Sequence, residues 1–210
     1  EDEDEMQREK LPETLPILPL RNTVLFPGVV VPITAGRDTS IKLINETNKG
    51  NKVIGVVSQK DENKENPGIE DINTIGTVAR ILRVLKMPDG NTTVIIQGKK
   101  RFEVAEVMTT DPYMTATVRE VAEAKPGEKN KEFDAIIESV KELALKIIKD
   151  SPNIPSEASF AIKNIESNSF LINFVCSNLN ISVADKQRIL EVNNLKDRAL
   201  EALKFMNIEF

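Results

Sequence analysis

The residues that could perform chemistry are few in this chain, and they form no recognisable catalytic set. The 210 residues contain no histidine and one cysteine, Cys176. These counts exclude His-based triads, His-ligated zinc, Cys-rich metal sites and imidazole acid–base catalysis. Cys176 falls within the apolar segment 170–179, which is typical of an inert buried thiol. The sequence therefore predicts no catalytic residue, no metal site and no cofactor-binding residue.

Phosphate-binding motifs are also missing from the sequence. Neither GxxxxGK[ST] nor GxGxxG occurs. The nearest basic, glycine-containing segment is Gly98-Lys99-Lys100-Arg101. It separates two segments of strand periodicity and precedes no helix, so we interpret it as a basic hairpin turn. The carboxylates are scattered among bases, as on a solvated surface.

Charge is concentrated at the N-terminus. Residues 1–13 hold seven acids and two bases, which equals the formal net charge of −5, so the remaining residues carry 26 acids and 26 bases. We interpret residues 1–13 as an acidic disordered tail; a docking role is the alternative. A neutral body offers little attraction to nucleic acid, and one Tyr with no Trp provides few stacking platforms. A barrel-shaped nucleic-acid-binding module is therefore disfavoured but open to a salt-dependent DNA titration.

Targeting signals are absent from the sequence pattern. No apolar run approaches the roughly 18 residues that span a membrane, and the acidic N-terminus lacks the positive charges of a signal peptide. A single cysteine fits a reducing compartment. The sequence thus predicts a cytoplasmic protein without a membrane partner.

The scaffold begins with residues 15–33, an almost wholly apolar stretch interrupted by four prolines. Because proline lacks the backbone donor and favours extended neighbours, this stretch cannot form a long helix. We predict two short strands at the rim of a sheet, which turn a corner at Phe26-Pro27-Gly28. The prolines are Pro16, Pro19, Pro27 and Pro32.

Strand periodicity continues as far as residue 122. A helix is expected over 35–50 and a long surface loop over 60–73. Pro88-Asp89-Gly90-Asn91 carries a strong hairpin signal. About six strands and one helix are typical of a bent or barrel-like antiparallel sheet. The expected strands after the corner are 52–59, 77–87, 92–97, 102–107 and 114–119.

The period then changes to that of helices. We predict a linker at residues 123–131 and a helical bundle over 132–210, after a β-rich subdomain at residues 14–122. Ser167 or Asn168, Ser182 and Asn194 are the expected starts of successive helices. The last helix shows no stop signal before Phe210, so we expect it to be truncated and to continue in a longer chain.

Several segments carry a resemblance to a known family. Residues 15–28 read LPILPLRNTVLFPG, and residues 31–37 read VPITAGR. Together with residues 75–81, 96–102 and 181–191, these resemble the N-terminal domain of the Lon ATP-dependent protease. The resemblance covers nearly the whole chain, and its first motif is the most specific. The acidic tail and the loop at 60–73 depart from it.

The resemblance implies an α+β fold in which a bent β-subdomain of PUA-like, pseudo-barrel form precedes a helical bundle. It also implies recognition of unfolded, damaged or degron-bearing proteins and support of a homohexamer. The parent enzyme would be an AAA+ serine endopeptidase that uses ATP and magnesium. Its ATPase domain and its Ser-Lys dyad would lie outside these residues, so no catalytic residue can be carried over.

An unfolded chain offers apolar side chains, so its receptor should expose an apolar patch with a polar rim. Turn residues are hard to bury, and methionine adapts to varied partners. The alternative is that these residues form the subdomain's own core or its contact with the helices. A stand-alone ligand-binding or adaptor module of the same fold is the second reading of the whole chain. The candidate substrate-binding residues are Phe26, Pro27, Leu85, Met87 and Pro88.

Overall fold

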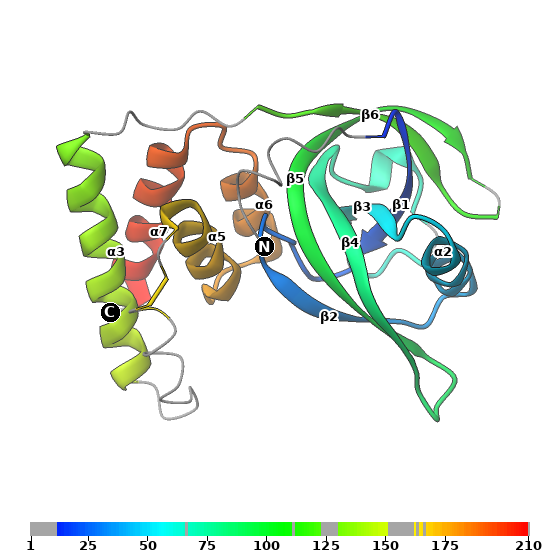
Figure 1. The fold of residues 1–210 in the computed structure, drawn as a ribbon, viewed down its shortest axis with the longest axis horizontal. Helices are drawn as coiled ribbons and strands as arrows, with labels where there is room; N and C mark the ends of the chain where they lie inside the picture. The colour runs from blue at the N-terminus through cyan, green and yellow to red at the C-terminus, as the bar shows by residue number, and fades with distance from the viewer. Residues whose placement is uncertain are drawn as a thin grey trace. The chain divides into compact units, whose positions relative to one another are not determined.

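The structure, a computed structural model, describes residues 12–65, 67–110, 112–122, 130–150, 162, 164–165 and 167–209. The chain divides into two compact units, Glu1–Val121 and Ala122–Phe210. The first contains the strands and the second contains long helices (Figure 1). The predicted succession of strands followed by helices is therefore observed. Most of the predicted acidic tail and of the linker at 123–131 lies outside the described residues.

The strands of the first unit form one six-stranded sheet with the order β2-β5-β4-β3-β1-β6. Because β6 also pairs with β5, five strands (β5, β4, β3, β1 and β6) close a ring, and β2 lies outside it. β2 pairs with the N-terminal half of β5. The bounds are β1 Thr14–Leu20, β2 Val30–Ala35, β3 Val53–Ser58, β4 Ile75–Lys86, β5 Thr92–Thr109 and β6 Thr115–Glu120.

The sheet is mixed, which corrects the prediction of an antiparallel sheet. β1 runs parallel to β3, with Ile17 opposite Gly55 and Leu20 opposite Ser58. The chain between them contributes β2 and helix α2 (Asp38–Lys49). A parallel pair needs such a long crossover connection. Side chains alternate between the two faces of a sheet in parallel and in antiparallel strands. The sequence pattern therefore could not show that β1 and β3 run parallel.

β5 is one continuous strand of 18 residues, which corrects the predicted turn at Gly98-Lys99-Lys100-Arg101. These residues are part of β5, and the side chains of Lys99, Lys100 and Arg101 are buried. Lys100 Nζ lies 3.4 Å from Glu120 Oε1 on β6. The Pro88–Asn91 hairpin, by contrast, is confirmed: Lys86 pairs with Thr92 and Gly90 has a φ of +92°.

The core of the first unit is built mainly of Ile, Val and Leu. One cluster joins β1, β2, β3, β4, β5 and α2, which contributes Leu43 and Ile44. A second cluster surrounds Phe102 and includes Leu15 and Ile17 of β1. Burial of each such side chain contributes about 1.5–3 kcal/mol. The apolar residues of β1 thus anchor both clusters.

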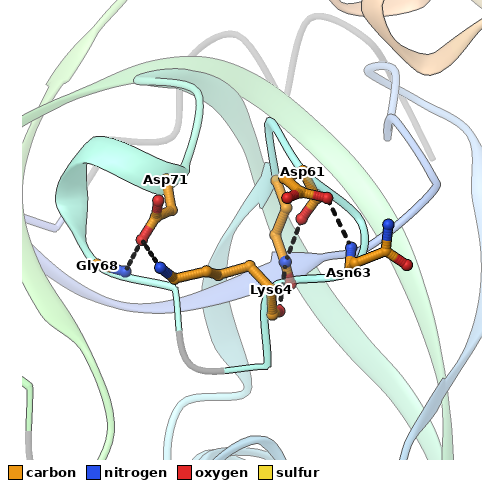
Figure 2. Close-up of polar contacts among 6 residues, drawn as sticks. Asp61, Asn63, Lys64, Gly68 and Asp71 are labelled. Carbon is orange, nitrogen blue, oxygen red and sulfur yellow. Dashed lines mark hydrogen bonds and ion pairs between the residues drawn. The ribbon is translucent and has the colours of Figure 1, made fainter.

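The described residues 60–65 and 67–73 lie between β3 and β4 and are linked by polar contacts. The carboxylate of Asp71 accepts a hydrogen bond from Gly68 N at 2.9 Å and lies 3.8 Å from Lys64 Nζ. Asp61 accepts a hydrogen bond from Asn63 N, and these contacts fold the loop back on itself (Figure 2). A short 3₁₀ turn, η1 (Ile69–Asp71), completes it.

The second unit consists of helices in its described part. α7 packs against α3, α5 and α6. The predicted starts at Ser167, Ser182 and Asn194 are confirmed, because each side chain accepts a backbone N–H from the first turn of its helix. These caps satisfy donors that a helix leaves unpaired. The bounds are α3 Lys131–Asp150, α5 Asn168–Asn178, α6 Val183–Leu190 and α7 Leu195–Glu209.

Candidate functional site

The candidate site is the solvent-facing surface of β2, β5 and β4 in the first unit. Residues opposite each other on neighbouring strands share one face of a sheet. Val94 and Ile96 of β5 are fully buried, so their side chains face the core. Ile95, between them, therefore faces outward, opposite Pro32 of β2 and Arg83 of β4. The register thus brings three strands to one outward surface.

This surface exposes apolar side chains. Val30 is 49% exposed, Leu82 is 47% exposed and Met87 is 43% exposed. Leu82 is the extra residue at a register shift between Ile81 and Arg83. The β4–β5 hairpin extends away from the ring (Figure 1). We call the following set the outer face: Val30, Pro32, Leu82, Leu85, Met87 and Ile95.

All charged side chains on the strand segments that build the outer face are positive. β2, β4 and residues 92–97 contain no Asp or Glu. Arg80 and Arg83 of β4 are exposed and lie opposite Gln97 and Ile95, on the same side of the sheet as the apolar side chains. An apolar surface with a basic rim suits a partner that brings apolar groups together with carboxylates.

The structure separates the five sequence-predicted residues. Met87 and Pro88 are exposed at the hairpin, Leu85 is half-buried on the outer face, and Pro27 is half-buried at the corner. Phe26 is fully buried, so the expectation that it is exposed is wrong.

The physical reason for the burial of Phe26 is that its segment is hydrogen-bonded onto the ring. Thr77 Oγ1 donates to the carbonyl of Leu25 at 2.7 Å, and Gly28 N donates to the carbonyl of Gly98 at 2.9 Å. A Cβ on Gly98 would lie 2.5 Å from the Phe26 carbonyl oxygen. Glycine at 98 thus permits the close approach that encloses Phe26.

Sequence reasoning missed four members of the outer face: Val30, Pro32, Leu82 and Ile95. Their segments read as ordinary apolar strands, and only the cross-strand register shows which side chains face outward. A signal was present in β2, where Pro32 interrupts an apolar strand. Proline in a strand indicates a sheet edge, and β2 is the edge strand that lies outside the ring.

Beside the outer face lies a groove of about 920 Å³. The end of β1, the strand β2 and the start of α2 line it, and Glu65 of the loop contributes to one wall. Two arginines, Arg21 and Arg37, also line it. Its volume is within the range of pockets that hold small ligands or peptide segments.

Arg37 is held in place by a buried side chain. Its Nη2 donates to Oε1 of Gln59, which is 2% exposed. Gln59 Nε2 donates in turn to the carbonyls of Asp61 and Lys64 at 3.0 and 2.9 Å. Burial, and next the charge of Arg21, lower the pKa of Arg37, whereas Glu65 raises it. The loop thus fixes one guanidinium in the groove close to another.

The described residues offer little for catalysis. They contain no group of three or more His, Cys, Asp or Glu side chains that could hold a metal ion. Cys176 on α5 is fully buried, and desolvation raises the pKa of its thiol to about 12. No described helix is long and apolar enough to cross a membrane.

Comparison with known proteins identifies the family. The model of the ATP-dependent protease La (LON) substrate-binding domain matches residues 14–208. The chain belongs to this family. Lon protease of Flavobacterium johnsoniae is 69% identical over 209 residues, and Lon protease of Cytophaga hutchinsonii is 49% identical over 207 residues. These matches cover 100% and 99% of this chain but 26% of each relative, so the chain spans about a quarter of their length.

Solved Lon N-terminal domains share the fold of this Lon domain. The N-terminal domain of Mycobacterium avium complex Lon protease aligns with a TM-score of 0.77 at 20% identity and covers 94% of this chain and 100% of that one. A Lon N-terminal domain protein from Xanthomonas campestris aligns with a TM-score of 0.64 at 16% identity, covering 91% and 97%. A mixed sheet with several helices is thus common to all three.

Proposed function

We propose that this Lon substrate-binding domain captures unfolded polypeptide through the outer face. The observation that carries the proposal is the exposure of Val30 on β2, of Leu82 on β4 and of Met87 directly after β4, with β5 between these two strands. Soluble monomeric domains rarely leave a contiguous apolar surface uncovered without a binding role. Unfolded chains supply the apolar side chains that such a surface can bury.

The chemistry of the outer face favours varied substrates over one defined sequence. Met87 is flexible and polarisable, so it adapts to differently shaped side chains. Arg80 and Arg83 add attraction for acidic residues in the same segment. We therefore expect segments that combine aliphatic or aromatic side chains with Asp or Glu to bind best, including degrons of that composition.

The role in a complete protein is part of the same proposal. The relatives are named Lon protease, and this chain corresponds to about a quarter of them. We propose that it delivers substrates to ATPase and serine-protease modules of a cytoplasmic homohexamer that uses ATP and magnesium. A stand-alone ligand-binding or adaptor module of PUA-like form is the alternative, and the length of the natural gene discriminates between them.

Binding to a permanently unfolded protein tests the proposal. Fluorescently labelled lactalbumin, reduced and carboxymethylated, is titrated with the domain, and native lactalbumin serves as the folded control. Met87→Asp should weaken binding about tenfold, because about 1.4 kcal/mol of apolar contact is lost. Its melting temperature should stay unchanged, because Met87 is exposed.

A matched methionine is available at the other end of β5. Met108 is 56% exposed but lies beyond residues 92–97, which build the outer face. Met108→Asp should therefore bind the unfolded lactalbumin like the wild type. Equal weakening by both substitutions, or no weakening by Met87→Asp, would show that binding is not located at the outer face.

A further inference from the structure

The free edge of β2 faces the groove. Among the described strands, β2 pairs with β5 alone, so one of its edges is unpaired. An unpaired edge presents backbone donors and acceptors to any extended chain. The groove beside it is lined by Pro32, Ile33, Thr34 and Ala35 of β2 itself.

The hydrogen-bonding register shows which backbone groups point to this edge. Gly98 N donates to the carbonyl of Val29, so Val29 faces β5. Alternate residues of an antiparallel strand face the same neighbour. Val31 and Ile33 therefore bond to β5, and the backbone groups of Val30, Pro32 and Thr34 point to the groove side. Pro32 fits this assignment, because it has no N–H to give to β5.

A proline also occurs on the opposite wall of the groove, in β1. Ile17 N of β1 donates to the carbonyl of Met114, just before β6, at 2.8 Å. The backbone nitrogen of Pro19, two residues later, points to the same side of β1 as Ile17 N. β6 does not reach Pro19, because it pairs only with residues 14–16 of β1. Pro19 lines the groove and has no backbone N–H to donate. Each wall of the groove thus contains one proline, Pro19 of β1 and Pro32 of β2.

β1 and β2 do not pair with each other. Each of the two prolines lacks the N–H that a ladder would use at its position. The edge of β2 nevertheless keeps the N–H groups of Val30 and Thr34 and three carbonyl groups. These N–H and carbonyl groups on the free edge of β2 can form hydrogen bonds with an incoming strand.

We propose that an extended segment of the unfolded substrate adds to β2 as an extra strand in this groove. The inference rests on the function proposed above and specifies how the same substrate is held. Alternate side chains of the added strand extend over the outer face beside Val30 and Pro32. The intervening side chains enter the groove, where Arg21 and Arg37 meet carboxylates. Main-chain pairing explains how one surface can accept many sequences.

The decisive variant pair is at Thr34. Thr34→Pro removes the N–H that faces the groove and leaves the bonds to β5 intact. Thr34→Ala is the matched control, because both variants lose the side-chain contact between Thr34 Oγ1 and Thr93 Oγ1. Thr34→Pro should bind unfolded carboxymethylated lactalbumin about threefold to tenfold more weakly than Thr34→Ala. Equal affinities in these two folded variants would overturn the inference.

Amide hydrogen exchange of the wild-type domain provides a second measurement that needs no substitution. Without substrate, the Val30 and Thr34 amides should exchange rapidly, while Val31 and Ile33 are protected by β5. Saturating unfolded lactalbumin should slow exchange at Val30 and Thr34 at least tenfold. Binding without this alternating protection would overturn strand addition. If Met87→Asp still weakens binding in that case, binding at the outer face is supported and only the strand addition is refuted.

Discussion

Arg198 on α7 and Asn173 on α5 form a buried hydrogen bond that joins the two helices. Arg198 Nη1 lies 2.9 Å from Asn173 Oδ1, and Nη2 donates to the carbonyl of Val192 at 2.7 Å. Arg198 is 0% exposed and Asn173 is 2% exposed. A guanidinium at this depth is tolerated because it is hydrogen-bonded.

Asn173→Ala should therefore destabilise the second unit. The substitution leaves Arg198 Nη1 buried without its acceptor, and we expect the free energy of unfolding to fall by about 2–3 kcal/mol. Urea denaturation followed by circular dichroism measures it. Asn178→Ala on the same helix is the control, because Asn178 donates to the Phe174 carbonyl from an exposed position and should cost less than about 1 kcal/mol. Similar losses for both would contradict a structural role of the buried pair.

Gly76→Ala should disrupt the ring. A Cβ at position 76 would lie 2.1 Å from the Val56 carbonyl oxygen on β3, so the two strands would have to separate. We expect a loss of more than about 3 kcal/mol or failure to fold. Gly50→Ala is the control, because its Cβ would meet no atom closer than 3.7 Å. Thermal unfolding of the two purified variants compares them, and a wild-type melting temperature for Gly76→Ala would refute the close contact.

Gln59→Ala should loosen the loop at 60–73. The buried amide bonds to Arg37 and to two loop carbonyls, so its removal leaves these groups without a partner. We expect about 2 kcal/mol of destabilisation and faster cleavage within the loop in limited proteolysis. Asn63→Ala is a suitable control, because the bond to Asp61 uses the Asn63 backbone N–H and survives the substitution. A cleavage rate equal to that of this control would argue against the role of Gln59.

The free energy of unfolding should fall at alkaline pH because of the buried thiol of Cys176. Burial raises the pKa of the folded thiol from 9.0 to about 12. A raised pKa means that the unfolded thiol ionises first, so the contribution is constant below about pH 8 and is lost as pH rises from 9 towards 12. The loss approaches about 1.4 kcal/mol per pH unit. The free energies of unfolding of wild type and Cys176→Ala should diverge in this way; parallel pH profiles would contradict the burial.

The sequence correctly predicted the turns and helix starts that depend on a few neighbouring residues. The Asp89-Gly90 turn and the helix starts at Ser167, Ser182 and Asn194 depend on a few adjacent residues, and all are observed. Family resemblance, carried by residues 15–37, predicted the membership that the comparisons establish.

The errors concern relations between distant residues. The parallel pairing of β1 with β3 depends on a crossover through α2, which leaves no mark on the alternation of either strand. The sequence predicted a turn at Gly98. In the structure, glycine is needed there because a Cβ would collide with the Phe26 carbonyl oxygen. The outer face became visible only when the register placed Pro32 opposite Ile95. Exposure of Phe26 was wrongly predicted for the same reason.

The pairing of the first strand with the last has a consequence for biosynthesis. Thr14 pairs with Thr117 and Leu15 with Ala116, so the ring cannot close until β6 has left the ribosome. Until then, the nascent chain carries the apolar residues of β1 without their final neighbours. Such intermediates are the species that chaperones bind. We therefore expect this domain to pass, during its synthesis, through a stage in which the apolar side chains of β1 are exposed as in an unfolded protein.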